Sequence, residues 1–161
     1  GAGFAGLVLK IVFPKSNVTL LEATNKKVEF LEFVKGELAL TDLNIIRTRA
    51  ENAGHNILFR ENFDLVVARG VARLPTLSEI TLPFCKIKGV CVLHKGPNAH
   101  IEVADSLTAI KTMGGFKTEL FPITHELDMT KTKTVFVKIT KSRQTPVKFP
   151  RPDGVPKKHS L

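Results

Sequence analysis

Apolar positions along the chain follow two spacings, and each spacing predicts one kind of element. Short apolar or β-branched runs predict strands, and apolar residues three or four positions apart predict helices. The predicted strands are 18–22, 44–48, 63–68, 89–95, 116–123 and 134–139. The predicted helices are 4–12, 26–40, one starting at Pro75, and 101–113. Strands that alternate with helices predict an α/β fold, with a parallel sheet, right-handed crossovers and a terminal antiparallel strand.

This pattern ends near Lys141, where proline and basic residues take over. Four prolines lie between residues 143 and 161, and we expect them to preclude a regular helix or a central strand. The sequence therefore predicts one domain over residues 1–142 and a basic, proline-rich tail over residues 143–161. Phe149 is the residue expected to pack this tail along the domain.

The net charge of +9 is concentrated near the C-terminus. Residues 1–130 hold 15 Lys or Arg and 14 Asp or Glu, whereas residues 131–161 hold nine and one. A basic segment suits a polyanion such as RNA, because each phosphate contact releases counterions. A solvated, solubilising tail explains the same charge equally well.

Composition excludes several other kinds of protein. The chain has 161 residues, of which 43% are hydrophobic, and no apolar run long enough to span a bilayer. Cys85 and Cys91 lie in apolar surroundings, which predicts buried, reduced thiols and a reducing compartment. The five histidines share no ligand spacing, so no metal site is expected. Cys91 and His94 point to opposite faces of a strand, which argues against nucleophilic catalysis.

The first six residues form a complete G-x-G-x-x-G run, Gly1 to Gly6, without the strand that normally precedes it. Such a run joins a strand to a helix and lets a cofactor approach the backbone. Glu22 follows 19 residues after Gly3, at the end of a predicted strand, where a carboxylate can accept hydrogen bonds from both ribose hydroxyls. Nicotinamide, flavin and S-adenosylmethionine enzymes all use this combination, and an exposed strand-end carboxylate is the alternative for Glu22.

Further polar residues follow the ends of other predicted strands, where open α/β sheets bind their ligands. Glu51 follows the 44–48 strand, and Arg69 and Lys95 end two apolar strands. We expect one crevice to collect these side chains together with the glycine run. A short helix beginning near Glu51 and solvated cations at the other two positions explain the same pattern.

Six segments in order resemble one family. They are GAGFAG, TLLEATNKKVEFL, RTRAEN, FDLVVARGVARL, HKGPN and the closing TPVKFPRPDGVPKKHSL. Together they are similar to the bacterial small-subunit ribosomal RNA guanine-N7 methyltransferases, called RsmG or GidB. The resemblance implies a Rossmann-like class I S-adenosylmethionine-dependent fold with a seven-stranded sheet, whose first strand is missing from this chain.

The resemblance also implies roles for individual residues. Binding of S-adenosylmethionine is expected at Gly1, Gly3, Phe4, Glu22, Ala50, Glu51 and Arg69. Contacts with RNA are expected at Lys95, Arg143, Lys148 and Arg151, and Lys95 is the one candidate for a catalytic role. Arg73 departs from the family, which usually has a proline there; it is expected to add a cation on the RNA side, and an exposed loop arginine explains it at least as well. Guanine N7 carries an in-plane lone pair, so no general base is required and positioning of the two reactants suffices.

Two other functions remain open from the residues alone. A nicotinamide-dependent oxidoreductase matches the glycine run and Glu22 equally well, and a non-catalytic RNA-binding module matches the tail. The expected partner is ribosomal RNA or the small ribosomal subunit, with no membrane and no metal. We expect a cytoplasmic monomer, or a plastid protein if the source is eukaryotic. Without the strand before Gly1, the chain alone is expected to be poorly stable and inactive.

Overall fold

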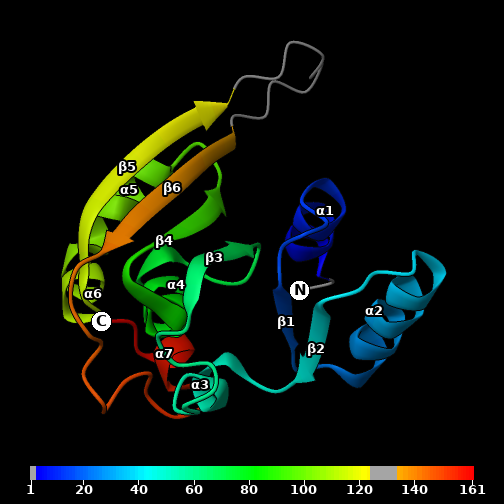
Figure 1. The fold of residues 1–161 in the computed structure, drawn as a ribbon. Coiled ribbons are helices and arrows are strands. Elements are labelled where there is room, and N and C mark those ends of the chain that lie inside the picture. The colour runs from blue at the N-terminus through cyan, green and yellow to red at the C-terminus, as the bar shows by residue number, and fades with distance from the viewer. Residues whose placement is uncertain (1–2, 124–133) are drawn as a thin grey trace. The chain divides into compact units, whose positions relative to one another are not determined.

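The structure, a computed structural model, describes residues 3–123 and 134–161. The chain divides into two compact units, Gly1–Ala50 and Glu51–Leu161, and each is considered by itself (Figure 1). Within the described ranges, no helix has the length and apolar character that crossing a membrane would require.

The first unit contains two parallel strands and two helices. Its elements are α1 (Phe4–Val12), β1 (Val18–Glu22), α2 (Asn25–Glu37) and β2 (Leu43–Arg47). β1 pairs with β2 from Val18 opposite Leu43 to Glu22 opposite Arg47, so both strands end at the same edge. Four buried leucines, one from each element, form the core of the unit: Leu7, Leu20, Leu31 and Leu43.

The second unit contains a four-stranded mixed sheet. Its strands are β3 (Phe63–Arg69), β4 (Cys85–Lys95), β5 (Gly115–Ile123) and β6 (Thr134–Lys141), in the order β3-β4-β6-β5. β3 and β4 are parallel, and β6 is antiparallel to both β4 and β5. The helices are α3 (Ala50–Ala53), α4 (Leu74–Thr81), the 3₁₀ turn η1 (Leu82–Phe84), α5 (Ala99–Asp105), α6 (Leu107–Thr112) and α7 (Val155–Lys158). Helix α3 begins at the last residue of the first unit.

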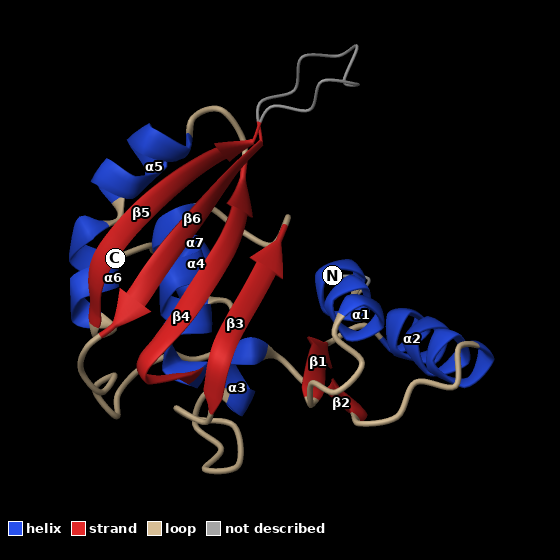
Figure 2. Cartoon of the chain, turned by 45° about the horizontal axis from the view of Figure 1, so that its top comes forward, coloured by secondary structure: helices blue, strands red, loops and turns tan. Residues whose placement is uncertain are grey.

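The core of the second unit lies between the sheet and helix α4 (Figure 2). Every residue of α4 is buried. Side chains alternate between the two faces of a strand, and the buried positions follow this period of two in both central strands. In β4 they include Cys91 and Leu93, and in β6 they include Val137 and Ile139. The two thiols are free and buried, as predicted, and burial raises the pKa of Cys85 to about 11 and that of Cys91 to about 12.

The tail packs against the second unit, as the sequence predicted. Thr145, Phe149 and Pro156 are buried, and Phe149 is only 5% exposed. The expectation that proline precludes a helix here was wrong, because residues 155–158 form the short helix α7. Pro156 lies in its first turn, where the missing N–H has no intrahelical partner to lose.

Two further details differ from the sequence prediction. The helix expected over 101–113 is two helices, α5 and α6, which meet at the buried Ser106. The Ser106 hydroxyl donates to the Glu102 carbonyl one turn earlier, a contact that bends helices. β4 also starts at Cys85, four residues before the predicted start at Gly89. The α/β class is confirmed, and the described strands form sheets of two and four, so the seven-stranded count stays a prediction.

Candidate functional site

The glycine run begins helix α1 in the first unit. Gly3 caps the helix with a φ of 68°, a left-handed conformation that favours glycine. A Cβ at Gly3 would lie 2.3 Å from Leu31 Cδ2, and a Cβ at Gly6 would lie 2.2 Å from Leu20 Cδ2. Both glycines therefore let the helix pack closely on its neighbours. Phe4 is 64% exposed, and Gly1 lies outside the described residues.

Glu22 ends β1 and is 6% exposed. Its Oε1 accepts a hydrogen bond of 2.8 Å from the Thr24 amide, and its Oε2 lies 4.0 Å from Lys27 Nζ. Burial alone would raise the pKa of Glu22, but the hydrogen bonds from Thr24 favour the ionised form, and the pKa is lowered. An ionised carboxylate at a strand end is an acceptor suited to a pair of hydroxyl groups.

Ala50 and Glu51 lie in α3, a helix of a single turn. Ala50 is the last residue of the first unit, and Glu51 is the first residue of the second. This short helix is one of the two alternatives that the sequence left open at Glu51. Glu51 Oε1 lies 3.4 Å from the amide nitrogen of Gly154 in the tail. That contact joins residues 103 positions apart in the chain, so no local sequence signal reveals it.

Arg69 and Lys95 lie at the ends of neighbouring parallel strands, as predicted. Arg69 pairs in register with His94, and Lys95 is the next residue of β4. No role was predicted for His94 at this edge, where its ring packs edge-to-face on Phe136 with centroids 5.3 Å apart. Burial lowers the pKa of His94, and the charge of Arg69 lowers it further. Both effects favour the neutral form of the His94 ring.

Lys95 has an acidic partner in the structure. Its Nζ lies 2.7 Å from Glu102 Oε2 and donates to the Ala72 carbonyl at 3.1 Å. The Lys95 side chain is 11% exposed. Glu102 Oε2 also accepts the amide of Leu74 at 2.9 Å, which fixes the start of α4. Lys95 is thus held in an ion pair beside the loop that follows β3.

The remaining cations predicted to contact RNA fall into two groups. Arg73, Arg143 and Lys148 are exposed, and Arg73 lies 3.5 Å from Asp105. Arg151 is different, because its guanidinium makes hydrogen bonds of 2.6 to 3.2 Å with Glu79, a carboxylate that is fully buried on α4. Arg151 therefore serves an internal ion pair, which also holds the tail.

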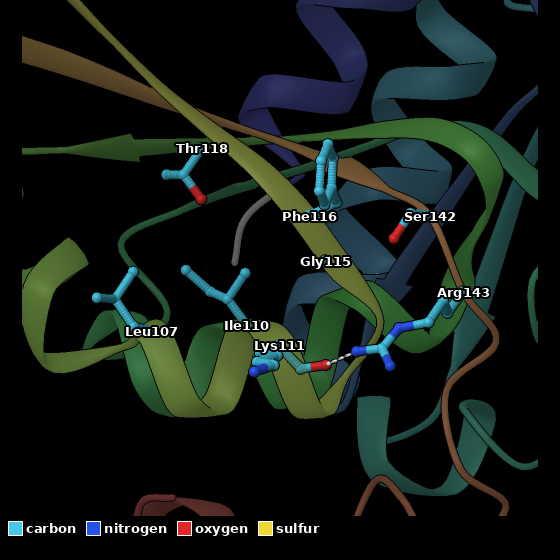
Figure 3. A pocket seen from close by; sticks show the side chains of 8 residues that line it. All are labelled: Leu107, Ile110, Lys111, Gly115, Phe116, Thr118, Ser142 and Arg143. Atoms are coloured by element: carbon cyan, nitrogen blue, oxygen red, sulfur yellow. Dashed lines mark hydrogen bonds between the residues drawn. The ribbon is translucent and has the colours of Figure 1, made fainter.

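Arg143 lines a cavity of about 470 Å³ beside α6 and the start of β5 (Figure 3). Its Nη2 donates to the Lys111 carbonyl at 3.1 Å, and the ring of Phe116, 80% exposed, also lines the cavity. β5 runs antiparallel to β6, and β6 antiparallel to β4, so this cavity lies beyond the end of the sheet opposite to Arg69 and Lys95. It is separate from the strand ends where the predicted site residues lie.

Each unit thus collects its own part of the predicted site. The first unit holds Gly3, Phe4, Glu22 and Ala50, and the second holds Glu51, Arg69 and Lys95. No group of three or more potential metal ligands occurs in residues 3–123 and 134–161. The first unit thus supplies a glycine turn and one ionised carboxylate, and the second supplies cations at strand ends.

The fold is that of S-adenosylmethionine-dependent methyltransferases. A geranyl diphosphate C-methyltransferase from Streptomyces coelicolor superimposes with a TM-score of 0.63 and 13% sequence identity, covering 88% of this chain and 70% of that one. A ribosomal RNA methylase from Streptococcus thermophilus superimposes with a TM-score of 0.53 and 14% identity, covering 79% and 74%.

The sequence narrows this class to one family. The model of the family GidB, described as rRNA small subunit methyltransferase G, matches residues 1–135. Ribosomal RNA small subunit methyltransferase G of Alkaliphilus metalliredigens is 45% identical over 162 residues, which cover 100% of this chain and 66% of that protein. The protein of the same name from Brevibacillus brevis is 43% identical and covered to 67%. The chain belongs to the rRNA small subunit methyltransferase G family and spans about two thirds of the length of these relatives.

Proposed function

We propose that this protein transfers a methyl group from S-adenosylmethionine to N7 of a guanine in small-subunit ribosomal RNA. The observation that carries the proposal is the ionised, buried Glu22 at the end of β1, in a unit whose glycine run begins a helix. Family membership selects the methyltransferase over the nicotinamide enzyme that the same two features permit. Among the fold relatives, the geranyl diphosphate C-methyltransferase was solved with S-adenosyl-L-homocysteine.

The residues present suit this cofactor. Glu22 is assigned to accept hydrogen bonds from the two ribose hydroxyls, and Gly3 leaves the backbone before α1 without a side chain. Ala50, Glu51, Phe4 and Arg69 are assigned to the rest of the nucleoside and amino-acid moiety. S-Adenosylmethionine supplies an electrophilic methyl group on a sulfonium.

The chemistry needs little from the protein beyond positioning. The lone pair of guanine N7 forms the new N–C bond as the S–C bond breaks, so the positive charge moves from sulfur to the purine and S-adenosylhomocysteine leaves. No proton is removed before the transfer, which agrees with a site that offers no obvious general base. Holding the two reactants in line accounts for most of the expected rate enhancement.

Lys95 is proposed to contact an RNA phosphate or the guanine O6 rather than the ring that becomes positive. Because Lys95 forms an ion pair with Glu102, substitution of either residue tests this proposal. Lys95→Ala should lower the rate of RNA methylation about tenfold with the affinity for S-adenosylhomocysteine unchanged. Glu102→Gln keeps the hydrogen-bonding shape and should leave that rate unchanged or raise it. A loss of cofactor affinity in Lys95→Ala would contradict the assignment to RNA.

The identity of the cofactor is tested by titration calorimetry on the complete gene product. We expect binding of S-adenosylhomocysteine and no binding of NAD. Glu22→Gln removes the charged acceptor and should weaken S-adenosylhomocysteine about tenfold, since hydrogen bonds to a charged group contribute about 1.5–3 kcal/mol. Binding of NAD alone would refute the proposed function.

The RNA partner, the oligomeric state and the cellular location are also proposals. The substrate is ribosomal RNA or the small ribosomal subunit, and the protein acts as a cytoplasmic monomer. The support for a reducing compartment is that Cys85 and Cys91 are both free and buried. Exposed Arg73, Arg143 and Lys148 are proposed to contact phosphates, which predicts an RNA affinity that falls with salt.

A further inference from the structure

One arginine, Arg60, makes four hydrogen bonds that connect the tail with the segment following Glu51. Arg60 Nη1 donates to the carbonyls of Gly54 at 2.7 Å and Phe149 at 2.8 Å. Its Nη2 donates to the carbonyls of Thr145 at 2.7 Å and Pro146 at 3.2 Å. One guanidinium therefore ties the residue just after α3 to three carbonyls of the tail. A planar fork with five donors can do this, and a lysine cannot.

Two other contacts connect the same two segments. His55 Nε2 lies 2.7 Å from the Pro150 carbonyl oxygen, and the Gly154 amide reaches Glu51 Oε1 at 3.4 Å. Gly154 has a φ of 79°, a left-handed conformation that places its amide at the start of α7. The contacts thus extend along residues 51–60 on one side and 145–154 on the other.

The tail is itself fixed on helix α4. The guanidinium and the amide of Arg151 both donate to Glu79, and the Thr76 hydroxyl donates to the Pro156 carbonyl at 2.8 Å. Glu79 is 0% exposed, and Arg151 is its ion-pair partner inside the protein. The position of the tail is therefore determined by the core of the second unit.

We propose that the tail segment, residues 145–156, positions helix α3 for cofactor binding and that Arg60 is the positioning residue. This rests on the proposed function, because Glu51 is one of the residues assigned to S-adenosylmethionine. Helix α3 has a single turn, which does not hold its own conformation in water. Contacts from a segment fixed on α4 supply the orientation, and the Glu51 carboxylate is presented ready for its ligand. The basic tail then acts on cofactor affinity, beyond any contact with RNA.

The test is the affinity for S-adenosylhomocysteine, measured by calorimetry on the complete gene product. Arg60→Met keeps the length of the side chain and removes its donors. We expect the Kd to rise about tenfold, because Glu51 is then no longer held in the orientation that binds the ligand. Arg143→Ala, which removes an exposed arginine of the tail outside residues 145–156, is the matched control and should leave the Kd within about twofold. Affinity for RNA at fixed salt should be the same in Arg60→Met as in the unsubstituted protein.

A milder variant separates positioning from folding. A Cβ at Gly154 would meet nothing within 4 Å, so Gly154→Ala acts only through its strained φ. We expect a Kd about threefold higher and a melting temperature lower by only a few degrees, since left-handed strain at one residue costs about 1–2 kcal/mol. An unchanged Kd in both Arg60→Met and Gly154→Ala would overturn the proposal, and if Arg60→Met fails to fold, Gly154→Ala decides alone. Failure of the unsubstituted protein to bind S-adenosylhomocysteine would instead refute the proposed function.

Discussion

Gly114 lies where two segments of backbone come together. Its φ is 89°, and a Cβ added there would lie 2.2 Å from the Arg143 carbonyl oxygen. The Gly114 carbonyl accepts the amides of Ser142 at 2.9 Å and Arg143 at 3.2 Å, so this backbone cannot move away without losing both bonds. Gly36, inside helix α2, offers the opposite case, since a Cβ there meets nothing within 4 Å.

These two glycines form a matched pair of substitutions. Gly114→Ala should lower the free energy of unfolding by about 3 kcal/mol, from left-handed strain and overlap with backbone. Gly36→Ala should raise it by about 0.5–1 kcal/mol, because alanine favours a helix interior. The measurement is urea unfolding followed by circular dichroism, since the chain has no Trp or Tyr. Equal effects of the two substitutions would contradict this account.

The sequence predicted part of the role of such residues. The helix predicted to end at Met113 does end there, because α6 stops at Thr112 with Met113 as its C-cap, next to Gly114. The approach of Arg143 to Gly114 could not be predicted, because it depends on how the chain returns after β6. The same limit applies to Arg151: its charge suggested RNA, whereas its partner Glu79 lies 72 residues earlier in the chain.

At the scale of elements, β6 ends in a lysine that is fully buried. Lys141 Nζ contacts Glu61 Oε1 at 2.7 Å, the Leu82 carbonyl at 2.9 Å and Thr145 Oγ1 at 2.9 Å. Glu61 Oε1 also accepts the Thr145 amide at 2.7 Å. The pair therefore joins the end of the strand, the loop before β3 and the start of the tail.

Removal of one partner of this pair should cost far more than removal of both. Glu61→Ala leaves a buried ammonium without its carboxylate, and we expect a loss of about 3–5 kcal/mol in the free energy of unfolding. The double variant Lys141→Met with Glu61→Gln keeps the volume and the acceptor for Thr145, and should lose about 1 kcal/mol or less. Urea unfolding at pH 7 measures both. A double variant as unstable as Glu61→Ala would show that the pair itself contributes the stability.

The buried lysine also predicts a dependence on pH. Burial lowers the pKa of Lys141 from its ordinary value of 10.5, although Glu61 favours the charged form. The unfolded chain thus keeps this proton to higher pH than the folded chain, so the contribution of Lys141 to stability rises with pH up to 10.5. Cys85, with a pKa of about 11, contributes with the opposite sign. The difference between the unsubstituted protein and Lys141→Met therefore isolates the lysine, and it should shift in favour of the unsubstituted protein as pH rises.

Strands and long helices were predictable because their apolar periods are set locally. β1 has the bounds expected from its run of apolar residues, and α1 ends before Pro14. The break at Ser106 was not predicted because a single serine is commonly accommodated within a helix and gives no signal that the helix ends. Helix α7 was missed because proline reads as a helix breaker unless its position within the first turn is known.

At the scale of the whole molecule, the ends of parallel strands carry three of the residues that the sequence predicted for the site. Glu22, Arg69 and Lys95 are all found at such ends. Local sequence patterns predict that these residues lie at strand ends, but they do not predict which residues form ion pairs or hydrogen bonds with them. The contacts of Arg60 with the tail are long-range and form only when the tail packs on the second unit. Glu102 follows Lys95 closely in the chain, but no sequence signal paired the two.

The tail provides a test at this largest scale. Truncation after residue 142 removes Arg151 from the buried Glu79 and removes the buried Phe149 and Pro156. The unpaired Glu79 carboxylate alone should cost about 3–5 kcal/mol. At about 2–4 °C per kcal/mol for a protein of this size, the melting temperature should fall by roughly 10 °C.

The control for this truncation changes the charge without the packing. Lys157→Ala with Lys158→Ala removes two exposed cations from the tail and should leave the melting temperature within about 2 °C. The affinity for RNA should fall modestly, and the dependence of that affinity on salt should become weaker. Thermal circular dichroism on the truncated protein and on this double variant separates the two roles. If both melt at the temperature of the unsubstituted protein, the contacts of Phe149 and Arg151 do not stabilise the fold. If both melt lower by the same amount, charge rather than packing accounts for the effect of the tail.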